Sequence, residues 1–280
     1  MREISAGLIT DLVEKLCMNA NYSLNSGIEQ ALSRCLACEE SETGKDVLRS
    51  MIENAAFARE EQVPICQDTG MAVVFVEIGM DAHIFGGDLD EAINDGVRRG
   101  YEKGYLRKSV VRDPVDRVNT NDNTPAVIHY SIVQGDKVKI TVAPKGFGSE
   151  NMSALNMLKP SDGIEGVKKF VIDTVSAAGA NPCPPIIVGV GVGGTMEKCA
   201  LLSKKALLRP PGQGSADPFW NGVERELLEK INALGIGPAG FGGRTTALGV
   251  NIETFPTHIA GLPVAVNIGC HVTRHAEGVL

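Results

Sequence analysis

The spacing of apolar residues predicts that the chain begins with helices. Apolar side chains recur three or four positions apart in the first stretch, at Leu8, Ile9, Leu12, Val13, Leu16 and Cys17. This spacing gathers them into one stripe on a helix. The same pattern returns over residues 28–38 and from 47 to about 58. Residues 1–60 are therefore predicted to form a helical N-terminal region.

Beyond residue 60 the pattern alternates between strand-like runs and helix-like stripes. Strands are expected over residues 71–78, 126–133, 138–143, 186–192, 247–254 and 263–268. Helices are expected over residues 88–104, 162–178 and 218–234, with one more around residue 199. The predicted fold class is α/β, a helical N-terminal region followed by mixed β-sheets flanked by helices. We expect one catalytic domain over residues 1–280, with 61–280 as its α/β core.

Composition narrows the classes of function. Hydrophobic residues make up 43% of the chain and charged residues 22%, which is ordinary for a globular protein. The formal net charge of -7 argues against nucleic-acid binding. No run reaches the roughly 18 apolar residues that a membrane span needs, and the charged N-terminus is unlike a signal peptide. We therefore expect a cytoplasmic protein.

The seven cysteines are an odd number, scattered along the chain. This usage indicates a reducing compartment and thiols that act as thiols. Cys35 and Cys38 form a CxxC pair, but no second pair lies at zinc-ribbon distance and no strand precedes it. We interpret this pair, and Cys17 on an apolar helix face, as helix packing.

The segment Pro64–Gly70 concentrates reactive groups. Cys66, Gln67 and Asp68 offer a thiolate, a carboxamide and a carboxylate on consecutive residues. The flanking proline and glycine predict a bent loop at the entrance of the following strand. Loops held by a rigid scaffold often carry metal-binding and acid–base groups. A buried cysteine beside a turn-capping aspartate would have the same sequence.

Two other motifs suggest different functions. The glycine run Val188–Gly194 resembles a dinucleotide-binding fingerprint. Such a fingerprint is followed, roughly 20 residues later, by an acidic residue at the end of a strand, whereas this sequence has Arg209 and two prolines there. Close approach of the backbone to a buried prosthetic group would explain the glycines equally well. Cys270, His271 and His275 could form a zinc site, with the two histidines on one helix face. Adjacent ligands, however, rarely converge on one tetrahedral ion.

Three single cysteines, Cys66, Cys183 and Cys270, each lie in a loop shaped by proline or glycine. Three thiolates around an iron–sulfur cube leave one iron without a protein ligand. Such an iron is a Lewis acid that can bind the hydroxyl and carboxylate of a hydroxy acid. The cysteines are far apart in the sequence, so their spacing alone does not decide between these interpretations.

Several motifs together resemble a known family. The segments Pro64–Gly70, Lys145–Asn151, Asn181–Pro185 and Pro256–His258, together with Cys270, resemble the α subunit of class I, iron–sulfur-dependent fumarate hydratases. The L(+)-tartrate dehydratase α subunit is a close cousin. The similarity covers essentially the whole chain, and it implies the Fe-S hydro-lyase α-type domain.

The resemblance also implies a site. It assigns a [4Fe-4S] cluster to Cys66, Cys183 and Cys270. The residues implied to face the substrate are Gln67, Asp68, Arg107, Gly146, Gly148 and His258. Among these, Asp68 could accept or relay a proton and His258 could hydrogen-bond the leaving hydroxyl, while Arg107 offers a fork for a carboxylate. If the family resemblance is set aside, the sequence favours a surface ion pair for Arg107. For His258 it is equally consistent with a buried histidine that hydrogen-bonds a backbone carbonyl.

The resemblance finally implies a reaction and a partner. We expect the reversible hydration of fumarate to L-malate in the tricarboxylic acid cycle, with dehydration of L(+)-tartrate to oxaloacetate as the alternative. Leu280 follows Cys270 by only ten residues, and we find neither a second cation nor a clear base for the substrate. We therefore expect a separate β subunit to supply the rest of the site, in an assembly of α2β2 type.

Overall fold

The structure, a computed structural model, describes residues 2–280 and divides them into two compact units. Unit 1 consists of the chain up to Asn25, residues 54–147 and residues 274–280. Unit 2 consists of residues 26–53 and 148–273. The chain therefore passes back and forth between the units, and one boundary falls inside the helix α3, Glu42–Glu61.

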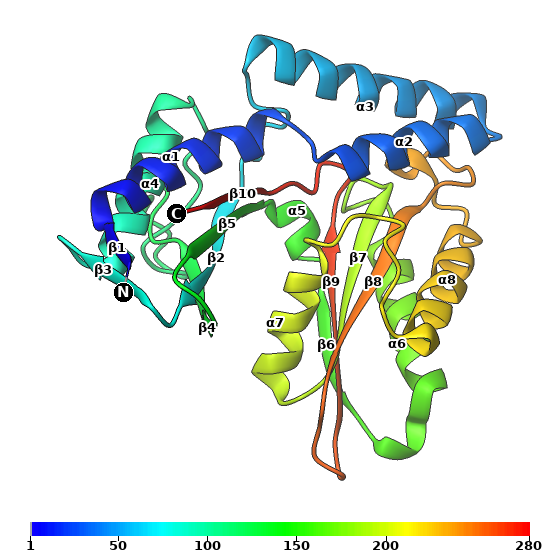
Figure 1. Ribbon diagram of the computed structural model, residues 1–280. Helices are drawn as coiled ribbons and strands as arrows, with labels where there is room; N and C mark the ends of the chain where they lie inside the picture. The colour runs from blue at the N-terminus through cyan, green and yellow to red at the C-terminus, as the bar shows by residue number, and fades with distance from the viewer. Residues whose placement is uncertain (1) are drawn as a thin grey trace. The chain divides into compact units, whose positions relative to one another are not determined.

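Unit 1 contains a four-stranded sheet in the order β10-β5-β2-β4 (Figure 1). Its strands are β2 (Met71–Gly79), β4 (Val127–Val133), β5 (Val138–Lys145) and β10 (Ala276–Val279). β2 pairs parallel with β4 and antiparallel with β5. The short strands β1 (Arg2–Ser5) and β3 (Ala82–Phe85) form a separate parallel pair.

Two helices share their apolar core with this sheet, α1 (Ala6–Tyr22) and α4 (Leu89–Lys103). Glycines on α4 allow it to lie close against α1. A Cβ at Gly96 would lie 2.7 Å from the Cβ of Val13, and one at Gly100 would lie 2.8 Å from the Cβ of Cys17. Any larger residue at these positions would push the two helices apart.

Unit 2 contains a second four-stranded sheet, in the order β6-β9-β7-β8. Its strands are β6 (Ala154–Leu158), β7 (Ile186–Gly193), β8 (Ala247–Phe255) and β9 (Leu262–Gly269). β7 pairs parallel with β8 and antiparallel with β9. The remaining helices are α2 (Ser26–Cys38), α5 (Phe147–Glu150), α6 (Gly163–Ala178), α7 (Met196–Ala206) and α8 (Pro218–Asn232), with 3-10 turns at Pro160–Asp162 and Pro238–Gly240.

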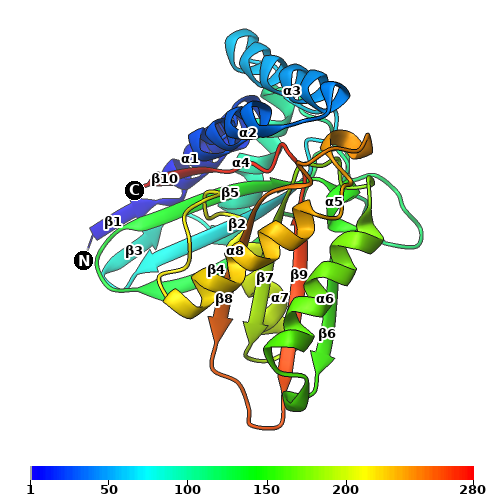
Figure 2. The same ribbon diagram turned by 90° about the vertical axis from the view of Figure 1, so that its right-hand side faces the viewer.

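Helices cover both faces of this sheet. Figure 2 shows α6 and α8 lying together in front of the strands, and their apolar residues form one core with β7, β8 and β9. Helix α7 covers the opposite face (Figure 1). Because β7 is covered on both faces, it is buried along its whole length and has a continuous apolar sequence.

The glycines of β7 are explained by α7. A Cβ at Gly189 would lie 2.2 Å from the carbonyl oxygen of Ser203, and one at Gly191 would lie 2.1 Å from that of Cys199. These glycines lie within a strand and let the backbone of a helix approach it. The glycine run therefore needs neither a dinucleotide phosphate nor a prosthetic group to explain it.

The predicted fold class is confirmed, since long N-terminal helices precede mixed sheets flanked by helices. Every helix and strand that the sequence predicts is present, but four short strands were not predicted: β1, β3, β6 and β10. Whether the two units act as one catalytic domain stays a prediction. Within residues 2–280, no helix has the length and apolar character that would allow it to span a membrane.

Candidate functional site

The loop that carries Cys66 lies in unit 1, between α3 and β2, and it is bent as predicted. The backbone N–H of Asp68 points at the Cys66 sulfur from 3.4 Å, and the thiol lies 3.6 Å from Oε1 of Gln67. Ile65 and Thr69 are buried on either side, whereas Cys66 itself is only half-buried. The bend therefore presents the sulfur while its neighbours anchor the loop.

Asp68 links this loop to the glycine loop after β5. Its Oδ1 accepts the N–H of Gly70 at 3.0 Å, and its Oδ2 accepts the N–H of Phe147 at 2.9 Å. A Cβ at Gly146 would lie 3.1 Å from Oδ2, so a larger residue there would require the carboxylate to move by a few tenths of an ångström. The structure thus brings Asp68 and Gly146 together in unit 1, with the carboxylate also acting as a turn cap.

Three buried polar side chains that sequence reasoning missed, those of Tyr101, Asn123 and Arg274, donate hydrogen bonds to carbonyl groups of the Cys66 loop. Tyr101 donates its hydroxyl to the carbonyls of Thr69 and Gly70, and Asn123 donates to that of Gly70. Arg274, only 4% exposed, donates to the carbonyl of Asp68 at 2.8 Å and to Asn21. Tyr101 lies on the predicted helix 88–104, but no sequence pattern marked any of these residues as a contact of the Cys66 loop.

Arg107 is tied to the same loop through its backbone, because Thr69 Oγ1 donates to the Arg107 carbonyl at 2.9 Å. Its side chain is exposed, and no ion pair of its guanidinium is found among residues 2–280. The surface ion pair expected from the sequence without the family is thus absent from this part of the chain. The guanidinium remains able to bind an anion.

Cys183 and Cys270 come together at one end of the sheet of unit 2. Cys183 precedes β7 and Cys270 follows β9, and the antiparallel register pairs Ile187 with Gly269. The imidazole Nδ1 of His271 lies 3.0 Å from the carbonyl oxygen of Cys183. Cys183 adopts a positive φ of 54° and is exposed, and Cys270 is half-buried. Both thiols are therefore accessible at the same end of this sheet.

His258 lies at the other end of that sheet, in the turn between β8 and β9 (Figure 1). The eight residues of β9 separate it from Cys270 by about 26 Å, at roughly 3.3 Å per residue. Its Nδ1 accepts the N–H of Ala260 at 3.2 Å, and its imidazole is exposed. Gly148, in α5, also belongs to unit 2, whereas Gly146 belongs to unit 1.

The structure removes the geometric reason for the zinc interpretation. Residues 271–272 form a turn and residues 273–275 have no regular structure, so His271 and His275 do not share a helix face. His275 exchanges hydrogen bonds with Asn25 in unit 1, its N–H donating to Oδ1 at 3.1 Å. Burial of the His275 imidazole lowers its pKa.

Comparison with known proteins assigns the chain to a protein family. A model of the fumarate hydratase (Fumerase) family matches residues 10–279. The chain belongs to the fumarate hydratase family. A protein of Methanocaldococcus jannaschii that is provisionally named L(+)-tartrate dehydratase subunit alpha is 45% identical over 276 residues, or 96% of each chain. The L(+)-tartrate dehydratase subunit alpha of Escherichia coli is 34% identical over 276 residues, or 97% of this chain and 90% of its own.

Fumarate hydratases are hydro-lyases, and the iron–sulfur cluster that the family implies has thiolate ligands. Cys66, Cys183 and Cys270 are accessible enough for this role, as are Cys35 and Cys38 of the CxxC pair. Cys17 and Cys199 do not fit, because burial raises the pKa of each thiol to about 12. No group of three or more His, Cys, Asp or Glu side chains surrounds a metal position within residues 2–280. Cys66 belongs to unit 1, and the other two cysteines belong to unit 2.

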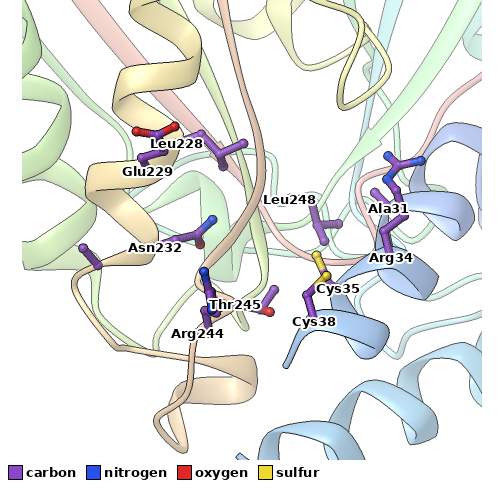
Figure 3. Close-up of a pocket in the computed structure, with 11 residues that line it drawn as sticks. Ala31, Arg34, Cys35, Cys38, Leu228, Glu229, Asn232, Arg244, Thr245 and Leu248 are labelled. Atoms are coloured by element: carbon purple, nitrogen blue, oxygen red, sulfur yellow. The ribbon is translucent and has the colours of Figure 1, made fainter. Parts of the chain in front are cut away.

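A pocket of about 570 Å³ opens in unit 2 beside the end of α2. Figure 3 shows Cys35 and Cys38 on one side of it, Asn232 of α8 on the other, and Arg244 and Thr245 between them. None of the residues predicted for the fumarate hydratase site lines it. The CxxC pair lies in a helix, as predicted, but it faces a hollow rather than a tightly packed core.

Glu39, next to this pocket, supports the loop before β8. Its carboxylate is 3% exposed and accepts backbone N–H groups of Glu40, Ser41, Arg244 and Thr245. That segment in turn supports the start of β7, since the Ile186 N–H donates to the carbonyl of Thr246 at 2.9 Å. Burial alone would raise the pKa of Glu39, but these hydrogen bonds lower it to about 2.

We therefore expect Glu39→Gln to destabilise the protein by about 2 kcal/mol, because an amide N–H2 would face buried donors. The pKa of Glu39 lies below its ordinary 4.5, so the stabilisation is complete above that pH and is lost as the pH falls toward 2. Urea unfolding at pH 7 and pH 4 measures both effects. Glu40→Gln, at an exposed neighbouring carboxylate, is the control. Equal stability of the two variants at pH 7 would contradict a supporting role for Glu39.

Proposed function

We propose that the chain is the α subunit of an iron–sulfur hydro-lyase that dehydrates L(+)-tartrate to oxaloacetate. The observation that carries this proposal is the identity of 45% and 34%, over nearly whole chains, with proteins named L(+)-tartrate dehydratase subunit alpha. This order reverses the one drawn from the sequence, which placed fumarate first. Hydration of fumarate to L-malate is the second candidate, and the description of the matching family favours it.

The proposed cluster ligands are Cys66, Cys183 and Cys270. A bound cluster would supply one iron without a cysteine ligand, a Lewis acid for the hydroxyl and carboxylate of the substrate. The chain supplies the thiolates from loops whose neighbouring residues are firmly hydrogen-bonded or paired in a sheet. Such anchoring keeps ligands in position before binding and reduces the entropy that binding must overcome.

The proposed substrate contacts in unit 1 have complementary chemistry. Arg107 provides a cation with a planar fork for one carboxylate. The carboxamide of Gln67 can donate to a second oxygen. Asp68 is oriented by two N–H donors, from Gly70 and Phe147, so that it can hold a proton at a defined place. Gly146 keeps the space beside that carboxylate open.

His258 requires a different assignment. Since it lies about 26 Å from Cys270 along β9, we propose that it reaches the site of a second α chain. Mixing His258→Asn chains with Cys270→Ser chains, each with its β partner, is expected to restore activity to about a quarter of wild type or less. Each variant assembly alone should be inactive or nearly so. No recovery in mixtures that demonstrably exchange subunits would contradict this assignment.

The substrate is decided by comparing kcat/KM for L(+)-tartrate and L-malate on one anaerobic preparation of the chain with its β subunit. We expect at least about a tenfold preference for L(+)-tartrate, because a site that hydrogen-bonds a second hydroxyl penalises a substrate without it. Preference for L-malate would establish the second candidate. Activity on neither acid, with the cluster intact, would refute both reactions while leaving the cluster proposal standing.

A further inference from the structure

The strand β4 forms an outer edge of the unit 1 sheet. It pairs with β2 on one side, and no strand within residues 2–280 pairs with it on the other. Its side chains are unusually exposed for apolar residues in a strand, at 43% for Tyr130 and 68% for Ile132. A row of backbone N–H and C=O groups along this edge is therefore available to another strand.

This edge lacks the features that normally prevent strands of different molecules from pairing. The seven residues of β4, VIHYSIV, include no lysine, no carboxylate and no proline. Its one titratable residue besides Tyr130 is His129, which stacks on Phe75 of the same sheet. Edge strands that must stay unpaired are usually short, charged or interrupted. β4 has none of these properties.

The order of residues in β4 is self-complementary about its centre. Read outward from Tyr130, the strand has Ser131 and His129, then Ile132 and Ile128, then Val133 and Val127. In an antiparallel pair related by a twofold axis at Tyr130, isoleucine lies opposite isoleucine and valine opposite valine. No charge faces a like charge, and β-branched pairs are among the favourable cross-strand neighbours.

We propose that β4 pairs antiparallel with β4 of a second copy of this chain, with Tyr130 opposite Tyr130. Two four-stranded sheets would then become one sheet of eight strands. Because side chains alternate between faces, Ile128, Tyr130 and Ile132 of both copies form one continuous apolar row. This row lies on the side of the sheet where Tyr130 hydrogen-bonds Asp90 of α4. The proposal does not depend on which acid is the substrate.

The size of this contact determines how strong the pairing can be. Seven residues extend about 23 Å, and a sheet edge with its side chains is about 10 Å deep. Such a patch is smaller than the roughly 800 Å² per partner of a standard stable interface. We therefore expect a dimer that dissociates in the micromolar range when the α chain is alone.

The first test is sedimentation velocity over a hundredfold range of concentration. The wild-type chain should shift from monomer to dimer, and Ile132→Lys should remain monomeric because it places a charge in the apolar row. Val115→Lys, at a still more exposed apolar residue of unit 1 (87%), is the control and should dimerise normally. Monomer at every wild-type concentration would refute the proposal, as would release of the β subunit by Ile132→Lys without loss of α–α association.

The second test fixes the register. Opposed residues in an antiparallel pair have Cα atoms about 4.5–5.5 Å apart, within reach of a disulfide. Tyr130→Cys should therefore cross-link to itself under mild oxidation, as shown by a peptide disulfide-linked through position 130 of both copies, which wild type lacks. Ile132→Cys should not, since two copies of residue 132 would lie about 14 Å apart, but it should cross-link to Ile128→Cys. Self-linkage at position 132, or none at position 130 in a dimeric protein, would overturn the pairing.

Discussion

Replacing Cys66, Cys183 or Cys270 by serine is expected to eliminate the iron–sulfur cluster and, with it, activity. Each thiol is accessible in a bent loop, and two of them lie at one end of the same sheet. Serine is a poor ligand for iron in a sulfide cluster, so each single change should lower bound iron from about four per chain to well below one. Activity with the β partner should fall at least about a thousandfold.

Three matched substitutions separate loss of a ligand from general damage. Cys38→Ser changes an exposed thiol of α2, and Cys17→Ser and Cys199→Ser change buried ones. All three should retain about four irons per chain, although the buried changes should lower stability by about 1 kcal/mol or more. Iron content and the visible spectrum of anaerobic protein measure the outcome. One stoichiometric zinc in place of iron would refute the cluster proposal.

The isolated chain, with its cluster rebuilt, is expected to be nearly inactive and to gain at least about a hundredfold when the β subunit is added. Arg107 is the one cation proposed for the substrate, yet a dicarboxylate has two charges to balance. For the base opposite the leaving hydroxyl, Asp68 is the one candidate that we propose among residues 2–280. Both Arg107 and Gln67 are exposed. Charge stabilisation is weak where water competes, and it strengthens when a partner excludes solvent.

The control for this result is the cluster itself, whose spectrum should be the same before and after the β subunit is added. A rise in activity together with a rise in iron content would mean that the β subunit acts on cluster assembly. Full turnover by the α chain alone would refute the proposed division of the site. The base would then lie among residues interpreted here as structural.

The parts of the fold that could be predicted from the sequence are those governed by local pattern. The face of α4 and the apolar run of β7 each follow from spacing within one segment. The short strands β1 and β10 could not be predicted in this way. Each has only four residues, and each pairs with a partner about 80 or more residues away. Such strands are defined by tertiary pairing rather than by their own composition.

The candidate site shows the same division. The bend at Cys66 was predicted because proline and glycine flank it, and the role of Asp68 as a turn cap was one of the interpretations considered. Arg274 was not predicted, because nothing near it in the sequence marks an arginine that becomes buried against the Asp68 carbonyl. The large distance between His258 and Cys270 could not be predicted either, because it depends on the conformation of the segment between them. Cys270 follows His258 by twelve positions in the sequence. Because β9 is extended between them, the two residues lie at opposite ends of the sheet.

The interleaved path of the chain through its two units has a consequence for biosynthesis. Unit 1 includes the first residues of the chain, but its last strand, β10, and Arg274, which donates to the Asp68 carbonyl, belong to residues 274–280. A ribosome therefore synthesises the Cys66 loop about 200 residues before the arginine that supports it. During synthesis the Cys66 loop therefore lacks this support, and unit 2, which extends to Thr273, is completed at nearly the same time as unit 1. A fully supported Cys66 loop therefore cannot form, and cannot receive iron and sulfide, until Arg274 has been synthesised.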